Sequence, residues 1–169
     1  MIRGFPYIAL SHNCGSIDQY LFGKNRYCLE ERGGEHIVAR GCGESCSNCY
    51  VEIPYEEASA MFLKGGGRNP CSFIIMWEGS EEALHISEGV ELGVIEVEGH
   101  KVHWLVSEGD SVRVGDRVAY IATSKGEVRS VRSSFSGVVV YISQLPASKP
   151  EKLLFVIVGG ENVRRARIS

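Results

Sequence analysis

The chain of 169 residues has a formal net charge of −3 and 44% hydrophobic residues, which is the composition of one ordinary folded domain or of two small ones. Its apolar runs are far shorter than the roughly 20 residues that span a bilayer, its first residues do not resemble a secretory signal, and it carries no basic stripe for nucleic acid. We therefore expect a cytoplasmic protein that binds neither membrane nor nucleic acid.

The chain uses one acidic and one basic residue type far more often than the other. Glu outnumbers Asp by 18 to 3, and Arg outnumbers Lys by 12 to 6. This bias is typical of proteins from thermophiles. It bears on the six cysteines, because intracellular proteins of hyperthermophiles are an exception to the rarity of cytosolic disulfides.

The first half of the chain predicts strands and one helix. "IPYEEASAMFLKGGG" (53–67) has Pro at its start, Glu in its first turn and Lys before Gly at its end, which predicts a short helix. Tyr55, Ala58 and Phe62 would share its buried face. Short apolar segments between Gly and Asn turns predict strands at 6–10, 26–30, 36–40 and 72–77.

The second half contains no cysteine and predicts only strands, separated by glycine turns, as in a small antiparallel barrel or sandwich. The predicted strands are 90–97, 101–106, 117–123, 127–131, 137–142 and 153–158. We expect three parts: an α+β segment with all the cysteines (1–85), a β domain (86–160) and a basic tail (161–169).

A cysteine array in the first half predicts either a metal site or disulfides. Cys42, Cys46 and Cys49 follow a C-x3-C-x2-C pattern in a Gly- and Ser-rich loop. A Cys-x2-Cys pair joined by further thiolates or a histidine forms a closed tetrahedral zinc site. Such a site would be completed by Cys14, Cys28 or His36.

The cysteines also allow other interpretations. Six cysteines in a chain of this composition are equally consistent with disulfides, and Cys71 beside "SFIIMW" suits a buried, inert thiol. The same three-cysteine spacing holds iron–sulfur clusters in radical-SAM enzymes, but those have a large partial α/β barrel for which this chain has no room.

The stretch "HWLVSEGDSVRVGDRVAYIATSKGEV" (103–128) resembles the half-motif of biotinyl/lipoyl carrier domains. The matching positions are Trp104, Val106, Gly109, Asp110, Val112, Gly115, Asp116, Val118 and Ile121, and Lys125 falls sixteen residues after Gly109 as in that family. Downstream, "SVRSSFSGVVVYI" (130–142) is similar to the family's E-V-P-S-P-x-x-G-V-V segment. The resemblance covers residues 88 to 158.

The resemblance implies a barrel-sandwich hybrid fold with Lys125 at a hairpin tip, where biotin or lipoate would be attached covalently. Such carriers dock on partner enzymes, so a protein partner is implied. The flanks of Lys125 differ from the family: "ATSKGE" keeps one threonine of the lipoyl version and lacks the methionines of biotin carriers. Downstream of "GVVVYI", the Gly-Asp turns are not repeated.

The chain as a whole resembles a group of uncharacterised archaeal proteins. Its pattern contains no catalytic motif, so we expect a protein without enzymatic activity of its own. Two functions follow: a carrier-like or carrier-derived module with Lys125 as the attachment point, or an unmodified binding or assembly protein whose N-terminal region is stabilised by zinc or disulfides. The sequence gives no indication of oligomeric state.

Overall fold

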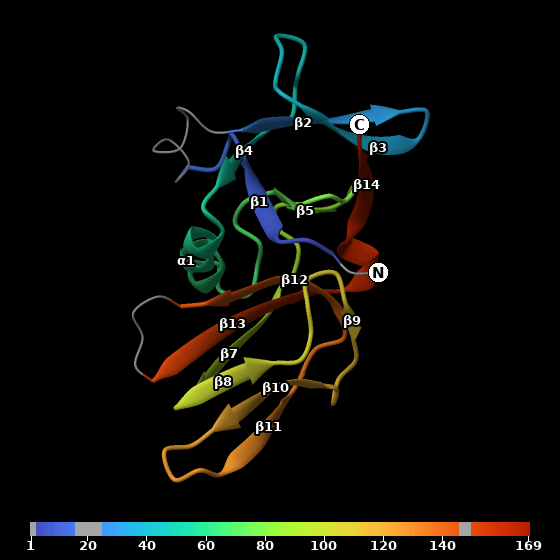
Figure 1. Cartoon of the computed structure of the whole chain (residues 1–169). Helices are drawn as coiled ribbons and strands as arrows, with labels where there is room; N and C mark the ends of the chain where they lie inside the picture. The colour runs from blue at the N-terminus through green and yellow to red at the C-terminus, as the bar shows by residue number, and fades with distance from the viewer. Residues whose placement is uncertain (1–2, 16–24, 146–149) are drawn as a thin grey trace.

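The computed structural model describes residues 3–15, 25–145 and 150–169. The chain is mainly β and has two parts that pack on each other, a closed barrel and two smaller facing sheets (Figure 1). Within the described ranges, no helix combines the length and the apolar composition needed to cross a bilayer.

The closed barrel has seven strands and contains the first part of the chain together with its last strand. Around the barrel the order is β1-β4-β2-β3-β14-β6-β5. The strands are β1 (Pro6–Ser11), β2 (Arg26–Arg32), β3 (Glu35–Arg40), β4 (Cys49–Ile53), β5 (Phe73–Trp77), β6 (Glu82–Ile86) and β14 (Arg164–Ile168).

The second part, here called the half-barrel, consists of a three-stranded sheet, β11-β10-β8, facing a four-stranded sheet, β7-β13-β12-β9. An apolar core that includes Val118, Val139 and Phe155 fills the space between the two sheets. The strands are β7 (Gly93–Gly99), β8 (Lys101–Trp104), β9 (Ser111–Val112), β10 (Arg117–Ala122), β11 (Val128–Arg132), β12 (Gly137–Gln144) and β13 (Glu151–Val158).

The central pair β12–β13 is buried on both faces, because the half-barrel core covers one face and the barrel with its helix covers the other. A strand that is buried on both faces has a continuous apolar sequence. This explains why β12 contains "GVVVYI" and β13 contains "LLFVIV". The register shifts between Val139 and Tyr141, so the side chain of Tyr141 joins that of Val140 on the barrel side. There the Tyr141 hydroxyl donates to the Tyr55 carbonyl oxygen over 2.8 Å.

The predicted helix is confirmed. It begins as a 3₁₀ turn, Tyr55–Glu57 (η2), and continues as α1 (Ala58–Lys64), with Gly65 as its C-cap. Ala58 and Phe62 are fully buried, and the ring of Phe62 packs at a tilt against that of Tyr141 with centroids 4.8 Å apart. A second 3₁₀ turn, η3 (Gly160–Asn162), leads from β13 to β14.

The strands predicted from apolar runs are confirmed, but the N-terminal segment is a closed barrel with one short helix rather than an α+β arrangement. The expected basic tail is also corrected. Within 161–169, β14 pairs in parallel with β3 and antiparallel with β6, and so closes the barrel. Exposed arginines flank the buried Ala166, and Arg165 and Arg167 form ion pairs with Glu82 and Glu35 at the surface.

The closing role of β14 predicts the effect of a charge at its buried position. Ala166 is 8% exposed and packs in the barrel core, so Ala166→Asp should lower the free energy of unfolding by about 3 kcal/mol or more. The exposed Ser169→Asp is the matched control and should change it by less than about 0.5 kcal/mol. Denaturant unfolding of both variants measures this. Equal stability of the two would mean that the segment behaves as a tail.

Candidate functional site

Lys125 lies at the tip of the hairpin between β10 and β11. The last strand pair is Ala122 with Val128, and the turn beyond it is closed by hydrogen bonds from the Gly126 N–H to the Thr123 carbonyl oxygen (3.0 Å) and from the Glu127 N–H to the same residue's hydroxyl (3.1 Å). Gly126 has φ +84°, which other residues adopt with difficulty. The sequence thus forms a tight turn that places the lysine at its outer point.

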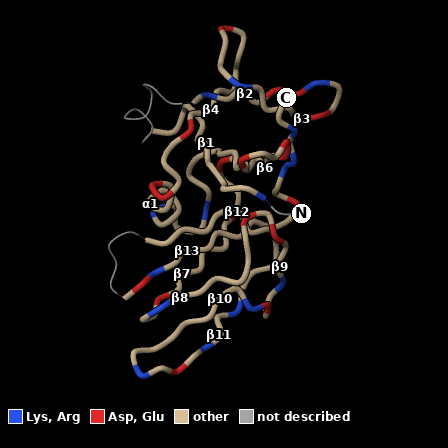
Figure 2. Tube along the Cα trace, in the orientation of Figure 1, with Lys and Arg blue, Asp and Glu red and all other residues tan. Residues whose placement is uncertain are grey.

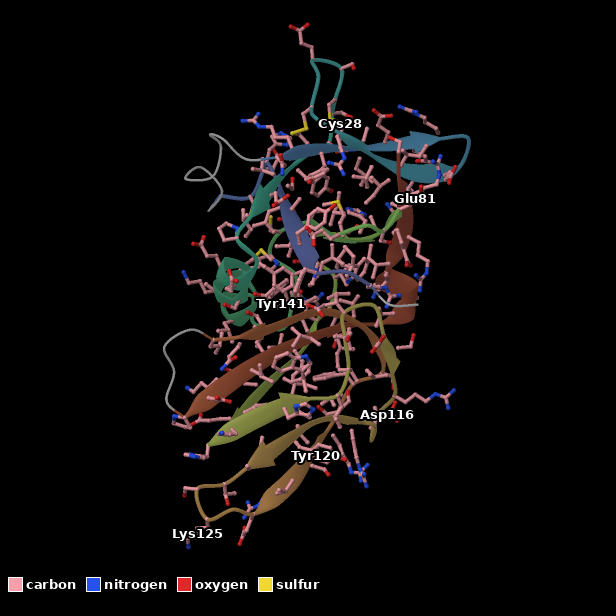
Figure 3. All side chains as sticks on the ribbon, viewed as in Figure 1. Cys28, Glu81, Asp116, Tyr120, Lys125 and Tyr141 are labelled. Atoms are coloured by element: carbon pink, nitrogen blue, oxygen red, sulfur yellow. A yellow bond between two sulfur atoms is a disulfide. The ribbon has the colours of Figure 1, made fainter. Side chains whose placement is uncertain are left out.

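The hairpin tip projects away from the barrel, and Lys125 lies at the opposite end of the molecule from Cys28 (Figure 3). Lys125 is exposed. No ion pair joins it to any carboxylate in the described part of the chain; the nearby Glu127 is paired with Arg129 at 3.1 Å. Its amine is therefore open to solvent on a rigid two-stranded support.

Two Gly-Asp turns at the entrance to this hairpin have the same geometry. In each, the Asp carboxylate accepts a 2.8 Å hydrogen bond from the backbone N–H three residues earlier, Ser107 for Asp110 and Arg113 for Asp116. The preceding glycine has φ +94° in both turns. Each turn thus combines a left-handed glycine with an aspartate whose side chain caps the turn.

The predicted cysteine array does come together, on the outer side of the barrel. Cys28 and Cys46 form one disulfide, and Cys42 and Cys49 form another. Cys28, which the sequence names among the candidates to complete a zinc site, is here the disulfide partner of Cys46. With these four cysteines in disulfides, no group of three His, Cys, Asp or Glu side chains in the described ranges is placed to hold a metal.

A cleft with a volume of about 860 Å³ lies between the barrel and the half-barrel. Aromatic side chains from both parts line it, among them Tyr55, Trp77 and Trp104. Trp104 is 48% exposed, which is high for an indole. Sequence reasoning missed this cleft because its walls come from several segments that are as far apart in the chain as Arg3 and Leu153.

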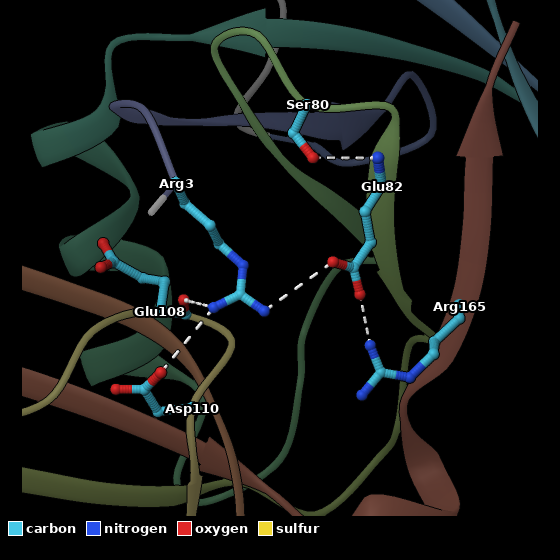
Figure 4. A network of polar contacts seen from close by, with 6 residues as sticks. All are labelled: Arg3, Ser80, Glu82, Glu108, Asp110 and Arg165. Atoms are coloured by element: carbon cyan, nitrogen blue, oxygen red, sulfur yellow. Dashed lines mark hydrogen bonds and ion pairs between the residues drawn. The ribbon is translucent and has the colours of Figure 1, made fainter. Parts of the chain in front are cut away.

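Arg3 is the cation in this cleft (Figure 4). Its guanidinium lies 5.0 Å from the centre of the Trp77 ring, 3.7 Å from the Asp110 carboxylate and 3.8 Å from that of Glu82. It also donates to the backbone carbonyl oxygen of Glu108 at 3.4 Å. Arg3 thus links the start of the chain to the first Gly-Asp turn of the half-barrel.

The partly buried carboxyl group of Glu108 forms part of one wall of the cleft. Burial raises the pKa of Glu108, and the hydrogen bond from the Tyr55 hydroxyl at 2.5 Å partly offsets this effect. Burial and the nearby Glu108 charge together raise the pKa of Tyr55 well above its ordinary value. The pair joins η2 to the half-barrel.

A second pocket, of about 340 Å³, lies at one end of the barrel and is polar. His85 Nε2 lies 2.9 Å from the Ser72 hydroxyl oxygen and 3.0 Å from the Tyr50 hydroxyl oxygen. The two hydroxyl oxygens are themselves 2.9 Å apart. Cys14 and Cys71 line the same pocket, which gathers residues from six separate segments and has no signal in the sequence pattern.

The group formed by Tyr50, Ser72 and His85 does not include the acidic residue of a Ser-His-Asp catalytic triad. His85 is 5% exposed, and its Nδ1 has no hydrogen-bond partner in the part of the chain that the structure describes. A histidine base normally has its second nitrogen oriented by a carboxylate or carbonyl. The three side chains form a hydrogen-bonded polar cluster at the barrel end.

The environment of His85 predicts how stability depends on pH. Burial, with smaller effects of Arg164 and His36, lowers its pKa from an ordinary 6.5 to about 4. The unfolded chain thus binds the proton more readily than the folded chain. The contribution of neutral His85 to the free energy of unfolding is therefore complete above pH 6.5 and is lost as the pH falls from 6.5 to 4. The loss should be on the order of 3 kcal/mol.

Denaturant unfolding at pH 7.5 and pH 4.5, for the wild type and His85→Asn, measures this effect. The raised pKa of Glu108 acts in the opposite direction in both proteins, so the difference between them isolates His85. The wild type should lose more stability on acidification than the variant. The same loss in both would mean that His85 does not remain neutral in the folded barrel.

Comparison with known proteins places the chain among archaeal proteins. It is 31% identical over 86 residues to the uncharacterized protein MJ0859 of Methanocaldococcus jannaschii, an alignment that covers 51% of this chain and 52% of the relative. The chain thus aligns with about half the length of that protein. Residues 20–160 match the family described as an uncharacterized protein conserved in archaea, DUF2118. The chain belongs to this archaeal family.

Proposed function

We propose that this chain is a non-catalytic, carrier-like module in which Lys125 is the attachment point for a biotinyl or lipoyl group. The observation that carries the proposal is the position of Lys125, exposed at the tip of the β10–β11 hairpin and pointing away from the barrel (Figure 3). An attached group must enter the site of the ligase and then those of partner enzymes, and such a position leaves the approach open.

The support for the hairpin favours the same function. The two Gly-Asp turns fix the course of the chain before β10, and the apolar core between the sheets holds β10 through Val118 and Ala119. The carrier therefore provides a rigid base and a single mobile side chain. The attached group would supply the carboxyl- or acyl-transfer chemistry, and the protein would supply its position.

The chain's own part in attachment is small. The Lys125 amine, as a free base, would attack the activated carboxyl carbon of the group, forming an amide bond with release of the activating group and a proton. Ser124 and Gly126 beside it are small, so the amine is approached without obstruction by neighbouring side chains. The residues beside Lys125 also differ from those of known carriers. We therefore expect a ligase that recognises the shape of the hairpin more than its sequence.

The proposal predicts a mass increase confined to one lysine. In chain purified from its native host, intact mass and peptide mapping should find the added acyl group on Lys125, and Lys125→Arg should abolish it. Lys101→Arg is the matched control, because Lys101 is exposed on β8 opposite Ala122 in the same sheet but outside the turn. That variant should keep the modification. An unmodified Lys125 under all growth conditions would refute the attachment.

A second candidate function is an unmodified binding or assembly protein, in which the half-barrel is only a scaffold. The aromatic cleft between the two parts favours it, since pockets at such junctions are common ligand sites. The cysteine cluster, as disulfides or as a structural zinc site, would stabilise the barrel side of that cleft. A bare Lys125 in the mass measurement is the outcome expected from this function.

A further inference from the structure

The four cysteines of the two disulfides form a compact group. Cys28 in β2 and Cys49 in β4 are directly opposite each other in the strand pairing. Each is bonded to a cysteine of the β3–β4 loop, with Cα atoms 6.0 Å apart for Cys28–Cys46 and 5.8 Å apart for Cys42–Cys49. All four sulfur atoms therefore belong to one site at the end of the molecule opposite Lys125.

The loop that carries Cys42 and Cys46 is also held by backbone hydrogen bonds. The Gly41 N–H donates to the Arg26 carbonyl oxygen at 2.7 Å, and the Leu29 N–H donates to that of Asn48 at 3.0 Å. Between these anchors, the Cys46 N–H donates to the Gly43 carbonyl oxygen at 3.0 Å. The loop is thus tied to β2 at both ends independently of the disulfides, so reduction would leave the four thiols close together.

The surroundings suit a negatively charged group. Arg26 and Arg40 line a small pocket together with Cys42. Four thiolates around one Zn²⁺ carry two net negative charges, which nearby guanidinium groups stabilise. The residues also have the right spacing, since Cys46 and Cys49 form a Cys-x2-Cys pair of the kind found in closed zinc sites.

From this arrangement we infer that Cys28, Cys42, Cys46 and Cys49 bind one zinc ion when reduced, and that the two disulfides are the oxidised form of the same site. In reduction, each disulfide takes up two electrons and two protons from a dithiol, which becomes a disulfide itself. Zn²⁺ then displaces the four thiol protons, which pass to solvent. In a tetrahedral site with Zn–S bonds of about 2.3 Å, neighbouring sulfurs lie about 3.8 Å apart, a spacing that side-chain rotation supplies.

The inference distinguishes these four cysteines from the other two. Cys14 and Cys71 line the polar pocket at the barrel end and lie outside both disulfides. Cys71 is buried, and burial together with contact with Cys14 raises the pKa of its thiol, which disfavours the thiolate that a metal needs. His36 lies in β3 opposite Glu31, away from the β2–β4 pairing.

Co²⁺ binding to the full chain tests the inference, with Co²⁺ as a spectroscopic substitute for Zn²⁺. After reduction with a dithiol and its removal without oxygen, the chain should bind one Co²⁺ and show thiolate charge-transfer and tetrahedral ligand-field absorption. Excess Zn²⁺ should abolish both bands. Cys46→Ser should weaken binding at least about tenfold, and Cys14→Ser should leave it unchanged.

Two results would overturn the inference. The first is a reduced wild-type chain that keeps its circular dichroism but takes up no Co²⁺, and this measurement needs no variant to fold. The second is binding that Cys14→Ser abolishes, which would place the metal elsewhere. The oxidised chain should bind none in either case. Because the readout does not involve Lys125, the outcome is independent of the carrier proposal.

Discussion

The structure depends on the burial of β12 and β13 on both faces. One face completes the half-barrel core through Val139 and Phe155, while the other packs on the barrel and α1 through Val140 and Tyr141. The irregularity before Tyr141 matters here, because the extra residue allows two consecutive side chains to face the barrel. In a freestanding half-barrel that face would meet water. Here it fixes the half-barrel on the barrel, so the Lys125 hairpin extends from a rigid base.

The order of the strands makes the two parts depend on each other. The chain leaves the barrel after β6, builds the whole half-barrel and returns as β14 to lie between β3 and β6. The barrel therefore closes only when the half-barrel has brought the two ends of the insertion together. Many of the pairings are far apart in sequence, a feature of slow-folding β proteins. Charged residues lie outside these apolar contacts, in turns and at exposed positions along the strands (Figure 2).

Sequence patterns predicted the elements whose local signal agrees with their environment. β1, β5, β12 and β13 are apolar runs, and α1 has its helical spacing and end signals. β4 and β6 were missed because "CYVEI" and "EALHI" mix apolar with polar residues in short segments. β14, "RRARI", has a single buried alanine among arginines, so only its partners β3 and β6 make it a strand. Such pairing is tertiary information, which local propensity does not contain.

The site residues divide in the same way. Gly126 and the two Gly-Asp turns are local signals, so the exposed turn at Lys125 could be predicted. The choice of Cys28 as a partner could not, because it depends on β2 lying beside β4. The Ser72–His85 contact and the packing of Arg3 on Trp77 likewise join segments that no motif connects. A sequence predicts turns well and the convergence of distant side chains poorly.

The cysteine cluster and Lys125 lie at opposite ends of the molecule, so chemistry at one does not reach the other directly (Figure 3). The cluster ties β2, β4 and their neighbouring loop, and therefore acts on the stability of the barrel. Loop closure or metal binding there would stabilise the folded barrel whichever form it takes. The barrel in turn covers the outer face of β12–β13. The redox or metal state of the cysteines should thus affect how firmly the half-barrel is held, while leaving the exposure of the Lys125 amine unchanged.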